Sequence, residues 1–155
     1  MFREVRRKNR ELPEEYIDSI LHKGEYGILG TQCEDGFPYA TPMSYVYLND
    51  RIYFHCAQEG LKTDNIRYND KVSFTVVTDV ETLPDQFSTR YQSVVIFGRA
   101  SFITGNEKDE VLSEIISKYA HEFPEEGKIY IERLKDRTQI IGIEILHRSA
   151  KGRLD

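Results

Sequence analysis

The sequence predicts a mainly β fold with peripheral helices, in which six antiparallel strands form a closed or nearly closed barrel. Short turn signals join consecutive strand segments, and strands joined by tight turns cannot be parallel. Two later segments are long, apolar and rich in β-branched residues, as buried strands are. Few segments have helical periodicity, which favours a barrel over a doubly wound sheet. We expect the helices to pack outside the barrel or to plug its ends.

Length and composition indicate one globular domain over residues 1–155, with a basic N-terminal arm (1–12) and a polar C-terminal tail (147–155). The chain is 39% hydrophobic, and no apolar run approaches the ~18–20 residues that a membrane span needs. The basic N-terminus has no apolar segment behind it, so export is not indicated and a cytoplasmic location is expected.

The first elements are a helix and a hairpin. Residues 11–24 combine a proline in the first turn with helically spaced apolar residues, and the helix should end at Gly24. Residues 25–32 are rich in β-formers, and the following Asp35-Gly36 pair is a strong hairpin signal. The sequence therefore predicts a return strand over residues 38–48.

A second hairpin and a short helix come next. Asn49-Asp50 turns the chain into a third strand over residues 51–57. Residues 61–70 predict a helix of at most two turns. Residues 71–80 are so uniformly apolar and β-branched that a strand buried on both faces is expected.

The last elements are two strands separated by helices. Residues 81–92 are polar and are expected to be irregular, whereas 93–103 predict a buried strand with a bulge or close approach at Gly98. An apolar stripe predicts a helix over 106–123, and residues 125–137 are expected to continue it or to form a second helix. A final strand is expected over residues 138–146.

Common catalytic and metal motifs are not found. The chain has no GxSxG elbow, no Walker A loop and no strand-linked GxGxxG. Its two cysteines, Cys33 and Cys56, lack CxxC spacing and a pair of nearby histidines, so a zinc site is not expected. A disulfide between them is possible but disfavoured in a cytosolic chain, and ordinary half-buried thiols are the simpler interpretation.

The stretch YFHCAQEGLKTDNI (53–66) suggests an anion site. A strand ends at His55-Cys56, and Lys62 follows at the opening of a helix. Free helix N-terminal N–H groups and a lysine ammonium together suit a phosphate. Lys62 could instead be a surface lysine that contacts Asp64, and His55 could be a hydrogen-bonded core or rim histidine.

The arm also allows two interpretations. Its first ten residues carry five basic groups and one acidic group, in a chain of net charge −5. A basic arm can bind nucleic acid, but the rest of the chain offers no basic stripe, so a tail that packs on a partner subunit is favoured.

Taken together, the segments resemble the flavin-binding split-barrel proteins of the pyridoxamine 5′-phosphate oxidase-like family, and among them the nitroimidazole-resistance branch. The resemblance covers most of the chain and weakens after residue 105. It is carried by RRKNRE (6–11), EYGILGT (25–31), DGFPYATPMSYVY (35–47), IYFHCAQEGLKTDNIRYNDKVSFTVV (52–77) and TRYQSVVIFGRA (89–100).

The resemblance implies a six-stranded Greek-key split barrel that forms an obligate homodimer with two FMN molecules at the subunit interface. It places the phosphate-binding lysine on Lys62. A basic residue near the C-terminus, Lys151 or Arg153, could also reach the cofactor. The remaining cofactor contacts fall on the phosphate loop (Gly60, Leu61), on the strand over the flavin edge (Thr41, Pro42, Met43, Ser44, Tyr45), on a strand end (Phe54, His55, Cys56) and on a strand of the opposite subunit (Ser93, Val94, Val95).

The function implied is an FMN-dependent oxidoreductase that transfers two electrons to a small acceptor such as a nitroimidazole. His55 is the candidate proton donor or substrate ligand, since histidine exchanges protons near neutral pH. The alternative is a dimeric module that binds flavin or haem without turnover, with His55 as a candidate axial ligand. No metal site is expected.

Overall fold

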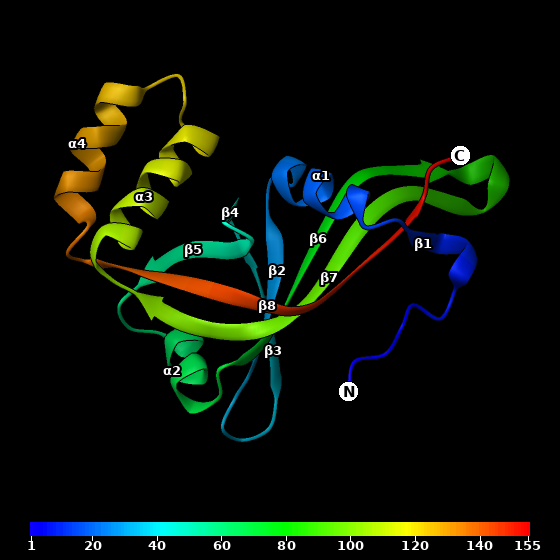
Figure 1. The fold of residues 1–155 in the computed structure, drawn as a ribbon, viewed down its shortest axis with the longest axis horizontal. Helices are drawn as coiled ribbons and strands as arrows, with labels where there is room; N and C mark the ends of the chain where they lie inside the picture. Colours follow the sequence, from blue (N-terminus) through cyan, green and yellow to red (C-terminus); the bar gives the residue numbers. More distant parts are fainter.

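The computed structural model describes residues 1–155 and confirms a mainly β, antiparallel fold with four α-helices (Figure 1). The sheet has eight strands rather than six, in the order β3-β2-β6-β7-β8-β5-β4, with β1 paired to β8. The strands are β1 (Glu11–Leu12), β2 (Gly27–Gln32), β3 (Pro38–Met43), β4 (Val46–Leu48), β5 (Arg51–Ala57), β6 (Lys71–Leu83), β7 (Ser88–Ile103) and β8 (Thr138–Arg153).

Both predicted tight turns are present. Gly36 has a positive φ of 93° in the turn between β2 and β3. Asn49 and Asp50 have φ values of 51° and 59° between β4 and β5. Two consecutive positive φ angles match the right-handed twist of the strands that the turn joins, and Asn and Asp tolerate this conformation better than most residues.

The strand predicted over 38–48 is broken in two at Ser44-Tyr45. The Tyr45 side chain is fully buried, and its hydroxyl donates to the Leu21 carbonyl at 2.6 Å. The break moves the chain from β3, which pairs with β2, to β4, which pairs with β5. Because β3 and β4 lie at opposite ends of the strand order, this short connection brings the two ends of the sheet together.

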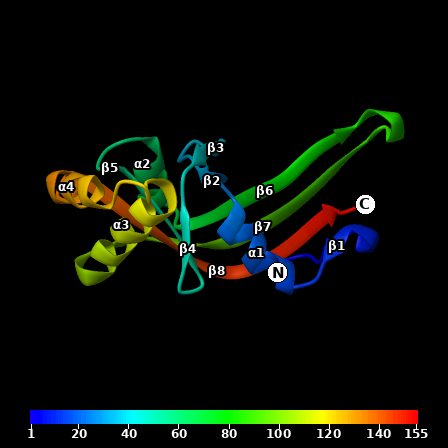
Figure 2. The ribbon, with the colours of Figure 1, turned by 90° about the horizontal axis from the view of Figure 1, so that it is seen from above.

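The hairpin of β6 and β7 is longer than predicted. Residues 81–92 are not irregular: Glu81 pairs with Arg90 beyond a bulge at residues 78–81, and the tip lies at a 3-10 turn, Pro84–Gln86. Figure 2 shows this hairpin projecting well beyond the rest of the sheet. A ribbon that leaves the core is solvated on both sides, which explains its polar composition.

The expectation that residues 71–80 are buried on both faces is also wrong. Burial alternates along β6, with Val72, Phe74, Val76 and Thr78 inside and the residues between them less buried or exposed. The strand therefore has one core face and one outward face.

The predicted polar tail 147–155 is mostly strand, because β8 continues to Arg153. Ala150 and Gly152 are buried in this part of β8, while the other residues from 147 to 153 are polar and half-buried. The β7–β8 register shifts at Phe97 and Gly98, which confirms the predicted bulge. A Cβ on Gly98 would lie 2.3 Å from the Glu144 carbonyl oxygen, so the close approach requires glycine.

The helices are α1 (Glu15–Lys23), α2 (Leu61–Tyr68), α3 (Gly105–Tyr119) and α4 (Pro124–Leu134). The first helix ends before Gly24, as predicted, and its Ile17, Ile20 and Leu21 enter the main core. The 106–123 and 125–137 segments form two helices, divided before Pro124. α3 packs on a smaller core with strand residues such as Ile140. None of the helices is both long and apolar enough to cross a lipid bilayer.

Candidate functional site

The predicted residues of β5 divide between its two faces. Phe54 is fully buried in the main core, and Cys56 packs against the same core. His55, between them, instead lines a small apolar cavity of about 40 Å³ with residues of α3 and α4 such as Ile115 and Leu134. The alternation of a strand thus separates His55 from Cys56.

Two cations lie near Cys56, one predicted and one not. Lys62 occupies the first turn of α2, and Arg67 its last turn. Arg67 stacks over the Phe102 ring, 4.9 Å from its centroid, and its only acidic neighbour is Asp64 at 3.8 Å. Lys62 has no acidic partner within 4.0 Å. Lys62 is therefore free to bind an anion at this end of the barrel, whereas Arg67 has one long ion-pair contact with Asp64.

Arg67 was missed because its environment depends on β7, which is distant in sequence. Five helical residues separate it from Lys62 by about 140° around the axis, so spacing alone does not place the two on one side. Only the position of Phe102 beside α2 shows where the guanidinium lies.

The pKa of the Cys56 thiol is affected by the charges of Lys62 and Arg67. Burial raises its pKa above the ordinary value, and Lys62 and Arg67 partly oppose this effect. The thiol is therefore protonated at neutral pH and is a poor nucleophile. Cys33 and Cys56 are both free and half-buried, as predicted.

Buried polar contacts fix α2 on the barrel. The Asn65 amide donates to the Thr31 hydroxyl at 3.0 Å and lies 3.4 Å from the Cys33 sulfur. Gly60, at the start of the helix, has a φ of 145° and open space where a Cβ would lie. The helix thus presents its first turn, which contains the exposed Leu61, to solvent.

The predicted flavin-edge residues do not share one face. Thr41 and Met43 pair with the buried Leu29 and Gly27, and Met43 packs on the main core. Pro42 is exposed between them, and Ser44 is exposed after β3 ends. Tyr45 lies inside the core, where burial raises its pKa far above the ordinary value. Its side chain is therefore closed to a ligand, and its backbone N–H and carbonyl already bond to Tyr119 and Lys118.

The predicted cofactor contacts on β7, Ser93 to Val95, also alternate between buried and half-buried positions. Val94 is fully buried, whereas Ser93 and Val95 are half-buried on the other face. Cross-strand pairing places Pro42, Ile28, Thr75 and Val95 in one row across four strands. We call this surface the outer sheet face; it consists of Ile28, Gly30, Ala40, Pro42, Ser73, Thr75, Val77, Ser93, Val95 and Phe97.

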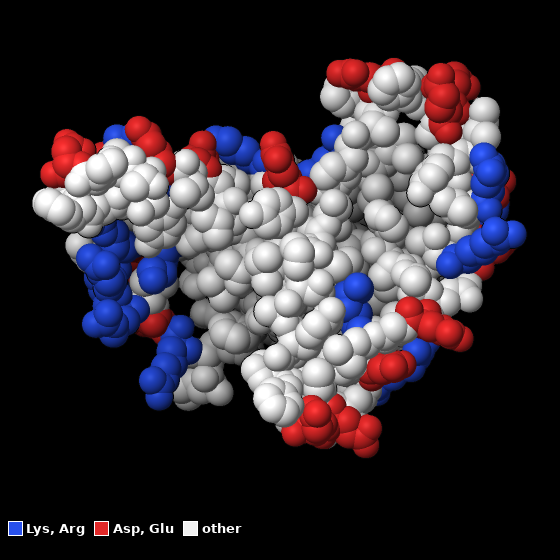
Figure 3. All heavy atoms as spheres, turned by 180° about the vertical axis from the view of Figure 1, so that it is seen from behind, with Lys and Arg blue, Asp and Glu red and all other residues white.

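The outer sheet face is uncharged. Val77 and Phe97 are 48% and 42% exposed, which is high for apolar residues. From behind, the molecule has a broad central area without charged side chains, which gather around its rim (Figure 3). Lys151 lies beside this face, because it pairs with Ser93 and its carbonyl accepts the Ser93 hydroxyl at 3.2 Å. Arg153 contacts Gln86 and Asp155 instead.

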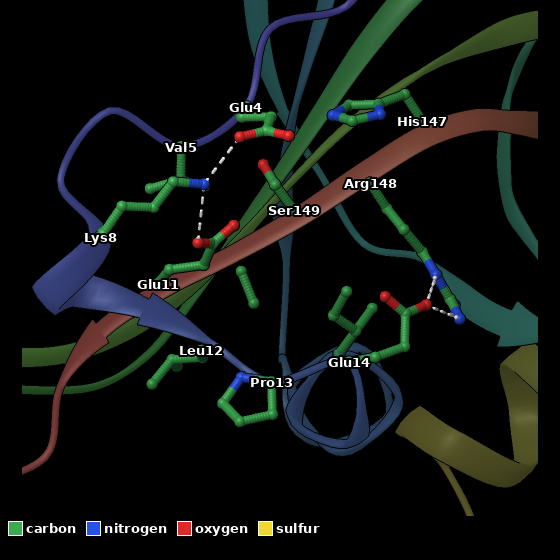
Figure 4. Close-up of a pocket in the computed structure, with 12 residues that line it drawn as sticks. Glu4, Val5, Lys8, Glu11, Leu12, Pro13, Glu14, His147, Arg148 and Ser149 are labelled. Carbon is green, nitrogen blue, oxygen red and sulfur yellow. Dashed lines mark hydrogen bonds and ion pairs between the residues drawn. The ribbon is translucent and has the colours of Figure 1, made fainter.

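The cavity between the N-terminal arm and β8 contains none of the predicted site residues (Figure 4). Its volume is about 510 Å³. Lys8 donates to Glu4 and Glu11 at 2.9 and 3.1 Å, and Arg148 pairs with Glu14. These charges pair with one another, so Lys8 and Arg148 are not free to bind an anion. His147 also lines the cavity, and its Nε2 atom is buried without a hydrogen-bond partner. The arm is partly ordered, since β1 joins β8.

Comparisons with known proteins agree with the fold. The family described as pyridoxamine 5′-phosphate oxidase matches residues 13–151. No curated protein matches the sequence significantly.

Solved structures with the same fold come from several bacteria. A conserved hypothetical protein from Mycobacterium tuberculosis is 19% identical, with a TM-score of 0.82 over 96% of this chain and 90% of that one. A protein from Bacteroides thetaiotaomicron, provisionally assigned to 5-nitroimidazole antibiotic resistance, is 23% identical, with a TM-score of 0.77 over 90% and 83%. The haem storage protein HutZ from Vibrio cholerae is 16% identical, with a TM-score of 0.70 over 91% and 96%.

The family match spans most of the chain, and the sheet is the antiparallel barrel that the structural neighbours share. The chain therefore belongs to the pyridoxamine 5′-phosphate oxidase-like family, a flavin-binding family with the split-barrel fold.

Proposed function

We propose that the protein is an FMN-dependent oxidoreductase that reduces a small acceptor, such as a nitroimidazole, by two electrons. The observation that carries the proposal is the unpaired Lys62 in the open first turn of α2, with Arg67 in the last turn, since both charges act on the Cys56 thiol. Its chemistry is that of a phosphate site, with a point charge, a planar guanidinium and free N–H groups.

The residues present fit an FMN phosphate. Lys62 and Arg67 would hold the phosphate, and the helix N–H groups after Gly60 would donate to its oxygens. Asp64, in the same turn, is 73% exposed, and its charge is screened by water. When bound, the flavin supplies the two-electron chemistry, and the protein binds the flavin and orients the electron acceptor beside it.

The dimer in this proposal is built on the outer sheet face. Ser93 and Val95 lie on it, whereas Val94 could contribute only its backbone. An uncharged surface with exposed apolar residues is what a permanent interface requires. In the proposal, this face of one subunit forms the second wall of the other subunit's flavin site.

His55 has a separate role in the proposal, because it lies on the other face of β5 from Cys56. Burial lowers its pKa below the ordinary value, so the imidazole is neutral at pH 7. A neutral imidazole can donate one hydrogen bond and accept another, which suits orientation of an electron acceptor more than donation of a proton.

The absorption spectrum of the purified protein tests the proposal directly. We expect flavin bands that disappear on extraction, with FMN rather than FAD in the extract. Reduction by a nicotinamide donor should bleach the bands, and a nitroimidazole should restore them. A colourless protein that does not take up added FMN would contradict the proposal.

The second candidate function is a haem-binding or flavin-binding module without turnover. His55 favours this function, because a neutral imidazole is a common iron ligand, and one structural neighbour is a haem storage protein. Addition of haemin should then give a Soret band that His55→Ala removes. A band unchanged by His55→Ala would exclude His55 as the ligand.

A further inference from the structure

A cavity of about 570 Å³ lies between the end of α1, the bend that follows β3 and the last turn of α3. This volume is typical of sites for small organic molecules. We call it the Lys118 cavity; it is lined by His22, Lys23, Gly24, Glu25, Tyr26, Ser44, Lys118 and Tyr119. None of the groups near Lys62 lines it.

Lys118 brings an uncompensated charge to this cavity. Its ammonium donates to the Tyr45 carbonyl at 2.9 Å and lies 3.8 Å from the centroid of the Tyr45 ring. No carboxylate lies within 4.0 Å of it, and burial lowers its pKa to about 8. A lysine has three N–H donors, and the Tyr45 carbonyl accepts from one. Two donors therefore remain for a ligand.

The walls around Lys118 are fixed by hydrogen bonds. The Tyr119 hydroxyl lies 2.6 Å from the Glu25 carbonyl oxygen and 2.9 Å from that of Tyr45, and it accepts the Tyr45 N–H at 3.0 Å. Lys23 is already paired with Asp79. Lys118 is thus the cation of the cavity that is free to bind an anion.

An adjoining cavity of about 280 Å³ shares Lys23, Glu25 and Tyr26 with the first. It is also lined by Thr78, which is only 8% exposed and whose hydroxyl is buried without a hydrogen-bond partner. Leaving such a group unpaired costs about 1–3 kcal/mol. A second polar group that lacks a partner therefore lies next to the Lys118 cavity.

We propose that the Lys118 cavity binds a small organic monocarboxylate with a planar apolar body. The carboxylate pairs with Lys118, and the body lies against Tyr26 and Tyr119. A single negative charge fits better than a phosphate dianion, because Glu25 and the carbonyl end of α1 both add negative potential. The site shares no residue with the phosphate site at Lys62 and Arg67, but Ser44, one of the residues predicted at the flavin edge, also lines it.

Calorimetric titration of the whole protein with benzoate tests the proposal, with benzamide as an uncharged ligand of the same shape. We expect saturable benzoate binding that Lys118→Met weakens at least tenfold, and benzamide binding that is weaker by a similar factor. Lys128→Met is the matched control, because Lys128 is exposed on α4 and pairs only with Glu125. Equal affinities for wild type and Lys118→Met, or for benzoate and benzamide, would overturn the proposal.

A spectroscopic measurement on the unsubstituted protein avoids any effect of the substitution on folding. Benzoate should shift the side-chain NMR resonances of Lys118 and not those of Lys128. A Lys118 resonance that benzoate leaves in place would also overturn the proposal.

Discussion

His55 and Cys56 are neighbours in the sequence but lie on opposite faces of β5. Cys56 packs toward the main core, near the charges of Lys62 and Arg67, whereas His55 lines a cavity with α3 and α4. Substitutions on the two sides of β5 should therefore have different effects. The proposed phosphate site near Cys56 and the proposed role of His55 can be tested separately.

Replacing Lys62 should weaken FMN binding and leave the apoprotein stable. A hydrogen bond to a charged group contributes about 1.5–3 kcal/mol, so Lys62→Met should raise the Kd for FMN roughly 10-fold to 100-fold. Lys62 has no acidic partner in the protein, so Tm of the apo form should barely change. Fluorescence titration and thermal unfolding measure the two effects, with Lys128→Met as control. Equal losses in affinity and Tm would indicate a structural lysine.

Arg67 should act with Lys62 on the same phosphate. Arg67→Met removes both the charge and the stacking on Phe102, and we expect FMN affinity to fall by about tenfold or more. Arg67→Lys keeps the charge but loses the planar guanidinium, and should recover only part of the affinity. Riboflavin, which has no phosphate, should bind both variants as it binds the wild type. A riboflavin affinity that falls as much as FMN affinity would contradict a phosphate contact.

A charge on the outer sheet face should prevent dimer formation. Val77 is 48% exposed, so Val77→Asp should cost the monomer little, whereas burying the carboxylate in an interface costs several kcal/mol. Sedimentation velocity should show a dimer for the wild type and a monomer for the variant. Ile129→Asp, at a 61% exposed position on α4, is the control and should remain dimeric. A Val77→Asp dimer as tight as wild type would place the interface elsewhere.

Lys118 should make the free energy of unfolding depend on pH in the alkaline range. Burial lowers its pKa to about 8 from 10.5, so between these values the unfolded chain binds more protons than the native one. The free energy of unfolding should therefore rise with pH across this range because of Lys118. The Tm of the wild type minus the Tm of Lys118→Met should increase from pH 8 to 10.5. The tyrosines also titrate at alkaline pH, but they are present in both proteins, so their effect cancels in this difference. A constant difference would mean that the ammonium is solvated.

His55 should remain neutral at pH 7 because burial lowers its pKa below 6.5. An NMR titration of His55 should give a midpoint under the ordinary 6.5. His55→Gln, which keeps a hydrogen-bonding group, should leave FMN affinity unchanged and lower turnover of the acceptor. If turnover of the wild type increases as the pH falls through the His55 midpoint, the protonated form is the active one. Turnover equal to wild type in His55→Gln would exclude a role in the reaction.

Local signals predicted the parts of the fold that depend on neighbouring residues. The Asp35-Gly36 and Asn49-Asp50 turns, the end of α1 and the bulge at Gly98 each follow from the backbone preferences of the residues involved. The position of Lys62 at the start of α2 was predicted in the same way.

The sequence-based predictions were wrong or incomplete where the burial of a segment depends on residues distant in the sequence. Residues 147–153 look like a tail in the sequence, because most of them are polar and only Ala150 and Gly152 are buried. Residues 81–92 look irregular because their hairpin projects from the core. Arg67 and Lys118 acquire their surroundings from Phe102 and Tyr45, which sequence spacing does not bring near them.

The pairing of β8 also has a consequence for how the chain folds. β8 pairs with β1, β5 and β7. Its pairing with β1 joins residues more than a hundred positions apart, Glu11 and Lys151, and its pairing with β5 joins residues more than eighty apart. Closing such large loops costs entropy before the contacts form, which makes folding slow. During synthesis, β5 and β7 must wait with unpaired edges until β8 emerges from the ribosome, and in that interval the nascent chain is most exposed to aggregation.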